Sequence, residues 1–451
     1  MTYIPFSKVP ITHIQLVNHV GYGYEPVKKR GLSTLTNHLL KEGTKTQSAL
    51  AISDTLKNLA TDLSVSTRLE YSTINLNSLD ENIDASLKLM ADITQNPVFK
   101  KPDIARIKLK LKNSLVTEKD NLNTVATKAY RFALYGNSYL GRWYLGTQKQ
   151  LKKITRKDIH RWYRSTWTPA NSELIIVSGM TKDALENKLN KHFGNWKAKK
   201  SKRGPKLPKK LNAKPIAQKL IWIDKPDATQ SVIMIGNRSA PFSPEAHAVR
   251  DAANMVLGGS FSSRLNLNLR EDKGYTYGAR SYIISKAHAG YYVGTASVKA
   301  DTTARSVAEF IKEYKEIVSS RPVTAREHTD VVNRLRMKYP SSFETGGAIL
   351  SQYSDVLTNR YPKDWLSSYD SRVSGITQER VQTELKSMLH PDNLVIVIVG
   401  DSTKYKDSVR SLGFNDVYDF EVTGRPHKKK KKKKKKRQGK KKRVSKKNKK
   451  S

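Results

Sequence analysis

The chain has 451 residues, of which 37% are hydrophobic and none is cysteine. The length is sufficient for two domains of about 200 residues each, and the lack of cysteine excludes disulfides, thiolate zinc sites and cysteine nucleophiles. The formal net charge is +43, and residues 428–451 hold 18 Lys and Arg and no acid, which leaves +25 for residues 1–427. Such a charge favours acidic partners: nucleic acid, anionic lipid, lipopolysaccharide or an acidic protein.

The N-terminus shows no targeting signal. The first ten residues lack a basic segment followed by an apolar stretch, and no window approaches 18 apolar residues. We expect no signal peptide and no transmembrane segment in this sequence. The compartment stays open: periplasmic or envelope-associated if a segment is missing upstream, and cytoplasmic otherwise.

Residues 1–197 alternate between strand and helix patterns. Apolar alternation predicts strands at 11–20, 63–69 and 72–79, and 3.6-residue periodicity predicts helices at 31–41, 48–59, 82–95 and 101–116. Helices segregated from hairpin-linked strands indicate an α+β fold rather than a doubly wound parallel sheet.

An internal duplication organises the chain. Ile154-Thr155, Ile159, Pro169, Asn171 and the apolar run ending at Gly179 are repeated about 222 residues later as Ile376-Thr377, Val381, Pro391, Asn393 and a run ending at Gly400. In each copy a helix starts after Thr, ends near Pro-x-Asn and leads into a β-branched strand. We therefore expect two homologous domains, each an antiparallel-rich sheet with helices packed on it.

The expected domains are 1–197 and 216–420. We expect an exposed linker rich in Lys and Pro between them, at residues 198–215 with the sequence AKKSKRGPKLPKKLNAKP. The second domain has helix patterns at 244–257 and 262–270 and paired strand patterns at 275–285 and 290–298. Residues 421–451 read as a disordered poly-Lys tail, because the segment is nearly devoid of apolar residues and repels itself.

The segment GLSTLTNHLLKEGT at 31–44 resembles the first helix of the pitrilysin/insulinase (processing-peptidase-like) family of zinc peptidases. In active members this helix carries H-x-x-E-H: the two His bind zinc and the Glu activates water. Here the motif falls on Thr34, Leu35, Thr36, Asn37 and His38, and the third ligand, a Glu about 76 residues further on in active relatives, falls on Ser114. The resemblance therefore implies an inactive-type member with no metal and no cofactor of its own.

Other candidate ligands are weak. His38 reads as a vestigial polar residue near a helix end. Glu118, one turn past Ser114, is the alternative ligand, but without a partner His it reads as a solvated helix residue. His13 and His19 lie about 20 Å apart along an extended strand, too far for one ion, and read as surface residues.

The segment GGSFSSRLNLNLREDKGYTYG at 258–278 is similar to the most recognisable C-terminal segment of the family. There an Arg and a Tyr seven residues later face the chamber; Arg270 and Tyr277 match them. Both side chains donate hydrogen bonds, so they can bind a peptide carbonyl and stabilise oxyanion charge. The alternative is structural: Arg270 complements the helix dipole, Gly274 caps the helix and Tyr277 packs on the sheet.

Two other activities are disfavoured. Gly258-Gly259 lacks the Lys-Ser/Thr of a P-loop. No G-x-S-x-G elbow is present, and Ser260, Ser262 and Ser263 have no nearby His, which argues against a serine hydrolase.

The resemblance implies a role as the non-catalytic subunit of a two-chain peptidase chamber. A zinc-bearing homologous chain would be the partner and an unfolded peptide the substrate, with Arg270 and Tyr277 acting on it in trans. The family normally has more chain, including a strand, before residues 7–20, so a truncated start is expected.

Two alternatives stay open. The first is a polyanion-binding scaffold, in which the Lys tail contacts an anionic surface without specific nucleic-acid recognition. The second is a structural subunit of a membrane complex, like the core subunits of the respiratory cytochrome reductase, which resemble this family.

Overall fold

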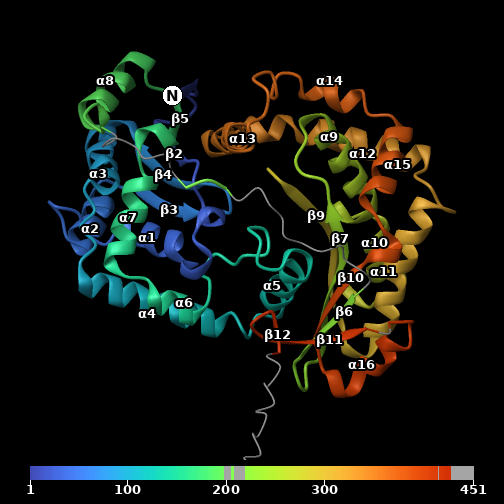
Figure 1. The fold of residues 1–451 in the computed structure, drawn as a ribbon. Helices are drawn as coiled ribbons and strands as arrows, with labels where there is room; N and C mark the ends of the chain where they lie inside the picture. Colours follow the sequence, from blue (N-terminus) through green and yellow to red (C-terminus); the bar gives the residue numbers. More distant parts are fainter. Residues whose placement is uncertain (198–204, 208–218, 415, 428–451) are drawn as a thin grey trace, which may run out of the picture.

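The chain folds into two halves that stand side by side (Figure 1). The computed structural model describes residues 1–197, 205–207, 219–414 and 416–427. We call residues 1–197 the N-terminal half and 219–427 the C-terminal half. Most of the expected linker and the Lys-rich tail from residue 428 lie outside the described residues.

The N-terminal half is built on a five-stranded sheet in the order β1-β5-β2-β4-β3. Only β1 and β5 run parallel; the other pairs are antiparallel. The strands are β1 (Thr2–Pro5), β2 (Ile11–Asn18), β3 (Asp62–Thr67), β4 (Ser72–Leu79) and β5 (Ser172–Ser178). Strand β1 therefore lies before residues 7–20, at the place where the family resemblance implies a strand.

The helices of this half are α1 (Leu32–Leu40), α2 (Ala49–Asn58), α3 (Ile83–Gln95), α4 (Lys101–Thr117), α5 (Leu122–Tyr135), α6 (Gln148–Lys153), α7 (Arg156–Thr166) and α8 (Lys182–Phe193). All except α5 lie with the N-terminal sheet in the ribbon view (Figure 1).

The C-terminal half has a seven-stranded sheet in the order β12-β11-β6-β10-β7-β9-β8. Its strands are β6 (Lys219–Asp224), β7 (Gln230–Ser239), β8 (Thr276–Lys286), β9 (Ala289–Lys299), β10 (Val395–Gly400), β11 (Val417–Glu421) and β12 (Arg425–Pro426). Residues 421–426 were expected in the disordered tail, but here that prediction is wrong: the pairing of Glu421 with Arg425 closes a hairpin at the sheet edge.

The helices of this half are α9 (Pro244–Asn254), α10 (Arg264–Asn266), α11 (Thr303–Val318), α12 (Ala325–Lys338), α13 (Gly346–Asn359), α14 (Tyr369–Ser374), α15 (Gln378–Met388) and α16 (Ser402–Arg410). Two π-helical segments, η5 (Met255–Gly259) and η6 (Leu267–Asp272), continue α9 and α10.

The duplication is visible in the topology. The order β6-β10-β7-β9-β8 repeats β1-β5-β2-β4-β3, including the single parallel pair at the same place. Both copies of the repeated helix start at the predicted threonine: the Thr155 hydroxyl accepts the N–H of Asp158, and the Thr377 hydroxyl that of Arg380. The two-domain α+β fold is confirmed, whereas the boundaries at 197 and 216 stay a prediction.

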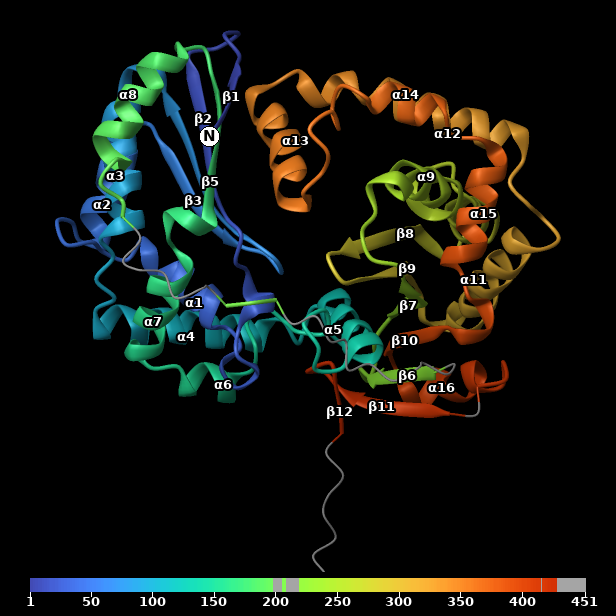
Figure 2. The same cartoon turned by 45° about the horizontal axis from the view of Figure 1, so that its top comes forward.

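The two halves exchange one helix each. Helix α13 packs on β2 and β5 of the N-terminal sheet, and α5 packs on β10 and β7 of the C-terminal sheet (Figure 2). Ile349 and Leu350 of α13 join a core with Val17, Ile175 and Val177. Burying one such aliphatic side chain contributes about 1.5–3 kcal/mol, so each helix is an integral layer of the opposite half.

Candidate functional site

Helix α1, which carries the positions of the zinc motif, is fixed at its first turn. The buried carboxyl group of Glu25 accepts the N–H groups of Gly31 (2.9 Å) and Ser33 (2.6 Å), which satisfies two orphan donors of the first turn. Gly31 has φ 88°, and a Cβ there would lie 2.6 Å from the carbonyl oxygen of Leu145. Only glycine fits this helix start.

The positions of the first His and of the general base hold the fold together. Thr34 donates its hydroxyl to the carbonyl of Tyr144 (2.8 Å). Asn37 accepts the indole N–H of Trp167 (3.0 Å) and donates to the hydroxyl of Thr67 (2.8 Å). Asn37 is 2% exposed, and its amide has no basic lone pair with which to take a proton from water.

His38 is the one imidazole at the motif. It is exposed, and partial desolvation together with the charge of Lys110 lowers the pKa of its ring. Ser114, at the position of the third ligand, donates its hydroxyl to the carbonyl of Lys110 (3.2 Å). Across the described part of the chain no group of three or more His, Cys, Asp or Glu is placed to hold a metal, and one imidazole among hydroxyl and amide groups does not fit a zinc ion.

Glu118 is not a solvated helix residue, so that prediction is wrong. Its side chain is only 13% exposed and forms an ion pair with Lys128. It also accepts the indole N–H of Trp143 (3.1 and 3.2 Å) and the hydroxyl of Tyr144 (3.0 Å). These partners occupy both oxygens, so Glu118 is not a replacement ligand either.

His13 and His19 were expected on the surface, and for His13 the structure differs. Its ring is hydrogen-bonded to Asn77 (2.7 Å) and lies so close to α13 that a Cβ on Gly346 would be 2.5 Å from its Cδ2. His13 is therefore packed between the halves. His19 lies beyond β2, with Nε2 2.8 Å from a carboxylate oxygen of Glu173.

Arg270 and Tyr277 are positioned by irregular backbone. Arg270 lies in the π-helical segment η6, a type of distortion that occurs preferentially at functional sites. Gly274, at φ 63°, ends the segment by donating its N–H to the carbonyl of Arg270 (3.1 Å). The Arg270 guanidinium is 4.7 Å from the ring centre of Phe261 and its Nε is 3.2 Å from Glu271.

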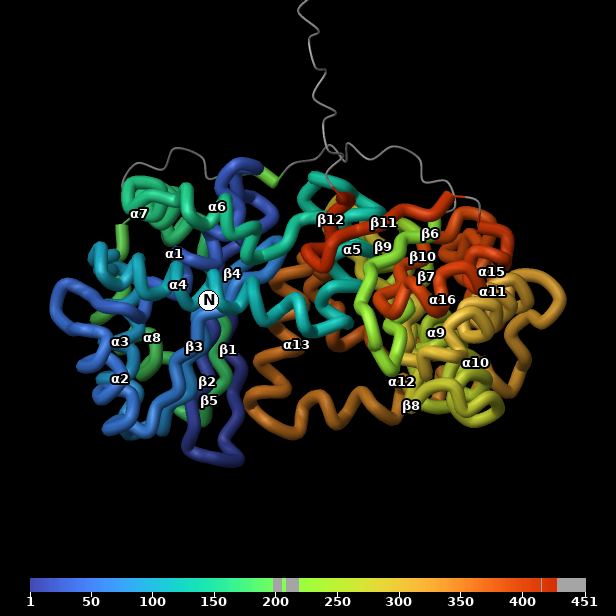
Figure 3. The backbone as a smooth tube through the Cα atoms, turned by 90° about the horizontal axis from the view of Figure 1, so that it is seen from below, coloured from blue at the N-terminus to red at the C-terminus, as the bar shows by residue number. Residues whose placement is uncertain are grey.

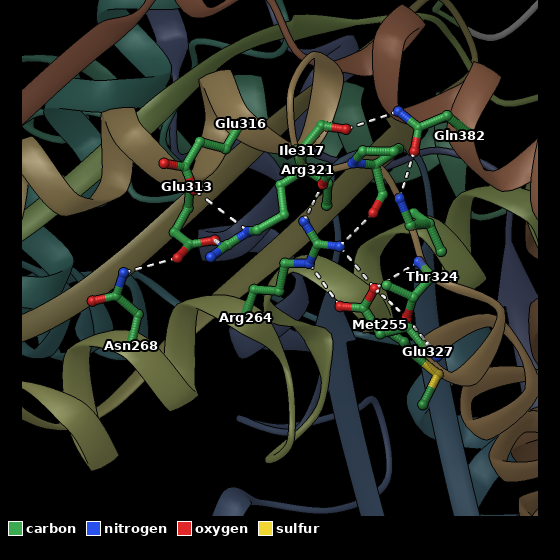
Figure 4. Close-up of polar contacts among 12 residues, drawn as sticks. Met255, Arg264, Asn268, Glu313, Glu316, Ile317, Arg321, Thr324, Glu327 and Gln382 are labelled. Carbon is green, nitrogen blue, oxygen red and sulfur yellow. Dashed lines mark hydrogen bonds and ion pairs between the residues drawn. The ribbon is translucent and has the colours of Figure 1, made fainter.

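A polar network anchors this segment to the helices behind it (Figure 4). Arg264, 8% exposed, donates two bonds of 2.7 Å to Glu327 of α12. Asn268, inside η6, donates to Glu313 of α11 (2.8 Å), and Glu313 in turn pairs with Arg321. A bidentate guanidinium–carboxylate pair fixes orientation as well as distance, so the backbone that carries Arg270 is held in place.

Tyr277 does not pack on the sheet, so that part of the structural alternative is wrong. A β-bulge between Thr276 and Ala279 interrupts the pairing of β8 with β9, and the bulge is held by the buried Asn266, which accepts the N–H of Ala279 (3.2 Å). Bulges re-aim side chains, and Tyr277 is 90% exposed. Among the described residues no hydrogen bond joins it to Arg270, and both lie in the C-terminal half, whereas His38 lies in the N-terminal half.

The glycines and serines before Arg270 have structural roles. A Cβ on Gly258 would lie 2.4 Å from the hydroxyl of Ser281, so glycine permits the close approach of η5 to β8. Ser260 and Ser263 donate to backbone carbonyls (3.1 and 2.7 Å), and Ser262 accepts from Arg334.

Comparison with known proteins decides the family. The family model described as "Insulinase (Peptidase family M16)" matches residues 6–148, and "Peptidase M16 inactive domain" matches residues 153–335. The chain belongs to the M16 peptidase family. Within M16 it is a homologue of the inactive type, since Thr34 and Asn37 replace the first ligand and the base.

Several M16 relatives match over most of the chain. The "Uncharacterized zinc protease YmxG" of Bacillus subtilis is 23% identical over 84% of this chain and 90% of its own length. The "Non-peptidase homolog YmxG" of Helicobacter pylori is 23% identical over 88% and 91%. Among solved structures, an M16 inactive domain from Pseudomonas fluorescens has TM-score 0.80 at 21% identity over 88% and 95%, and a protease from Helicobacter pylori 0.82 at 17% over 88% and 96%.

Sequence reasoning missed the partners of the motif positions. Trp167 and Tyr144 lie 130 and 110 residues from Asn37 and Thr34, and no local pattern links them.

None of the helices in the described ranges combines the length and apolarity needed to span a lipid bilayer.

Proposed function

We propose that this chain is the non-catalytic subunit of a two-chain M16 peptidase. A homologous zinc-bearing chain supplies the metal, and this chain presents Arg270 and Tyr277 to an unfolded peptide held between the two. The observation that carries the proposal is the exposure of Tyr277. The residue is 90% exposed, its side chain has no hydrogen bond within the described ranges, and it lies on a bulge where the buried Asn266 accepts the N–H of Ala279. An aromatic residue placed in solvent by an anchored bulge is suited to a ligand rather than to the fold.

The chemistry of the pair supports the same role. The guanidinium of Arg270 donates several hydrogen bonds and the phenol of Tyr277 donates one, so each can bind a carbonyl oxygen that becomes negative during hydrolysis. Neither removes a proton from water. The bonds made by Thr34 and Asn37 to the fold support assigning the metal and the base to another chain.

The test reconstitutes the pair. This chain is mixed with the zinc-bearing M16 chain of the same organism, and cleavage of an unfolded fluorogenic peptide is measured for each chain alone and for the mixture. We expect activity in the mixture, with Arg270→Gln and Tyr277→Phe each lowering kcat/KM about 10²-fold, the usual effect of removing one donor to an oxyanion.

An exposed Tyr and an exposed Arg of the same half serve as matched controls. Tyr282, also on β8, is 50% exposed, and Arg326 on α12 has a side chain that is 91% exposed; Tyr282→Phe and Arg326→Gln should leave the rate within about twofold. Unchanged activity in both pair variants would remove their assigned role.

The alternative is a polyanion-binding or structural scaffold without a role in proteolysis. The observation in its favour is the excess of +25 in residues 1–427. It predicts no hydrolysis in the mixture and binding to polyanions that weakens steeply as salt rises.

A further inference from the structure

A basic cavity lies where three distant segments meet. Its volume is about 400 Å³, within the range of small-molecule sites. The end of α4 and helix α5 form one side, residues 141–149 another, and the β11–β12 hairpin the third. Seen from below, β12 lies next to α5 (Figure 3).

The charges around the cavity are unbalanced. Six cationic side chains line it against the single carboxylate of Glu421; the six are Lys119, Lys128, Arg131, Arg142, Lys149 and Arg425. Only Lys128 has an ion-pair partner among the described residues, Glu118. Glu421 forms no ion pair within the described ranges; its carboxylate accepts the hydroxyl of Thr423 (3.3 Å).

Buried guanidinium nitrogens at the cavity lack acceptors. In the described part of the chain, Nη1 of Arg425 and Nε of Arg142 are buried without a hydrogen-bond partner, as is Nε of the neighbouring Arg30. Arg142 is 4% exposed. Leaving a buried charged donor unpaired is unfavourable, and such groups call for an ion or ligand that satisfies them.

The hairpin is held against α5 in a way that places Arg425. Gly424 has φ 70°, and a Cβ there would lie 2.6 Å from Cβ of Lys128 and 2.9 Å from the nitrogen of Ala129. This close approach puts the Arg425 guanidinium 4.0 Å from the ring centre of Phe132. Burial and the charge of Arg30 lower the pKa of Arg425 to about 10, an electrostatic cost that a bound anion would relieve.

We propose that this cavity is a binding site for a small, multiply charged phosphate compound, in which Arg142, Arg425 and Lys149 contact the phosphates. Planar guanidinium groups match phosphate oxygens, and the surrounding ammonium groups add charge without directional demands. Between the cations the wall is apolar, formed by Leu115, Trp143 and Pro426, which suits an organic phosphate. The site is separate from Arg270 and Tyr277 and does not depend on the proposed peptidase role.

The test uses the full chain, with its Lys-rich tail, in 150 mM salt. Binding of inorganic pyrophosphate and of ATP is measured by calorimetry for the wild type, for Lys149→Gln/Arg425→Gln, and for the control Lys315→Gln/Arg326→Gln, which removes one Lys and one Arg from exposed positions. Because all three proteins carry the same tail, its contribution cancels. We expect the dissociation constant to rise about tenfold or more in the cavity variant, equivalent to one lost ionic hydrogen bond, and less than about twofold in the control.

The relative affinities for ATP and pyrophosphate, and the change in affinity on mutation, test the proposal. Tighter binding of ATP than of pyrophosphate supports an organic ligand against the apolar wall, and equal binding restricts recognition to the phosphates. Equal affinity of the two double variants, or no binding to any protein, overturns the proposal. If Arg425→Gln lowers the melting temperature, the single variant Lys149→Gln, at an exposed position, decides: we expect a loss of about threefold or more, and an unchanged affinity refutes the site.

Discussion

Replacing Asn37 by alanine tests whether the position of the general base now serves the fold. The substitution removes the acceptor of the Trp167 indole N–H, which is 3.0 Å from Asn37, and Trp167 is only 4% exposed. An orphaned buried donor costs about 1–3 kcal/mol, and the lost amide packing adds about 1 kcal/mol. Thr67 is partly exposed and can bond to water instead. We therefore expect a loss of about 2–4 kcal/mol in the free energy of unfolding.

The assay is urea unfolding followed by fluorescence, in a cycle with Trp167→Phe. Phenylalanine has no N–H, so the two substitutions should be coupled by about 1 kcal/mol or more. Asn113→Ala, at an exposed position of α4, is the control and should change stability by less than about 0.5 kcal/mol. A loss below that value for Asn37→Ala, or strict additivity in the cycle, would refute a structural role for this position.

Two further predictions concern the packing between the halves and the start of α1. Gly346→Ala should loosen α13 and speed its limited proteolysis, because the new Cβ would lie 2.5 Å from His13, whereas Gly347→Ala meets nothing within 4 Å and should not; equal protection of both variants would contradict this. Burial raises the pKa of Glu25 from 4.5 to about 8, against the hydrogen bonds from Ser33 and Gly31. The folded state thus binds the proton of the Glu25 carboxyl group more tightly than the unfolded chain does. The stabilisation that this proton gives to the fold is complete below pH 4.5 and is lost as the pH rises to about 8. The stability of the wild type relative to Glu25→Gln should therefore fall between pH 5 and 8, and a constant difference would show that Glu25 is already ionised in the fold.

The sequence predicts what depends on local patterns. Thr155 and Thr377 mark the two repeated helices because a side-chain oxygen caps N–H groups within the next turn. The same repeat predicted the strands that follow, since each apolar run is short and β-branched. Thr34 and Asn37 were identified as substitutions in the zinc motif from the resemblance of residues 31–44 to the first helix of the family.

What depends on distant partners was not predicted. Glu118 looked solvated because its partners Trp143 and Tyr144 follow 25 and 26 residues later. Helices α5 and α13 were not predicted, and an apolar helix face would not indicate which sheet covers it. Likewise, the hairpin at Arg425 was assigned to the tail because two-residue pairing leaves almost no hydrophobic pattern.

The reciprocal placement of α5 and α13 bears on how the chain acquires its structure. Either half synthesised alone would expose to water the sheet surface that the other half's helix covers, which favours docking of the two halves over their separate existence. Two unfused copies trading this element would close as an intertwined symmetric pair, and joining them end to end yields the connectivity seen in this protein.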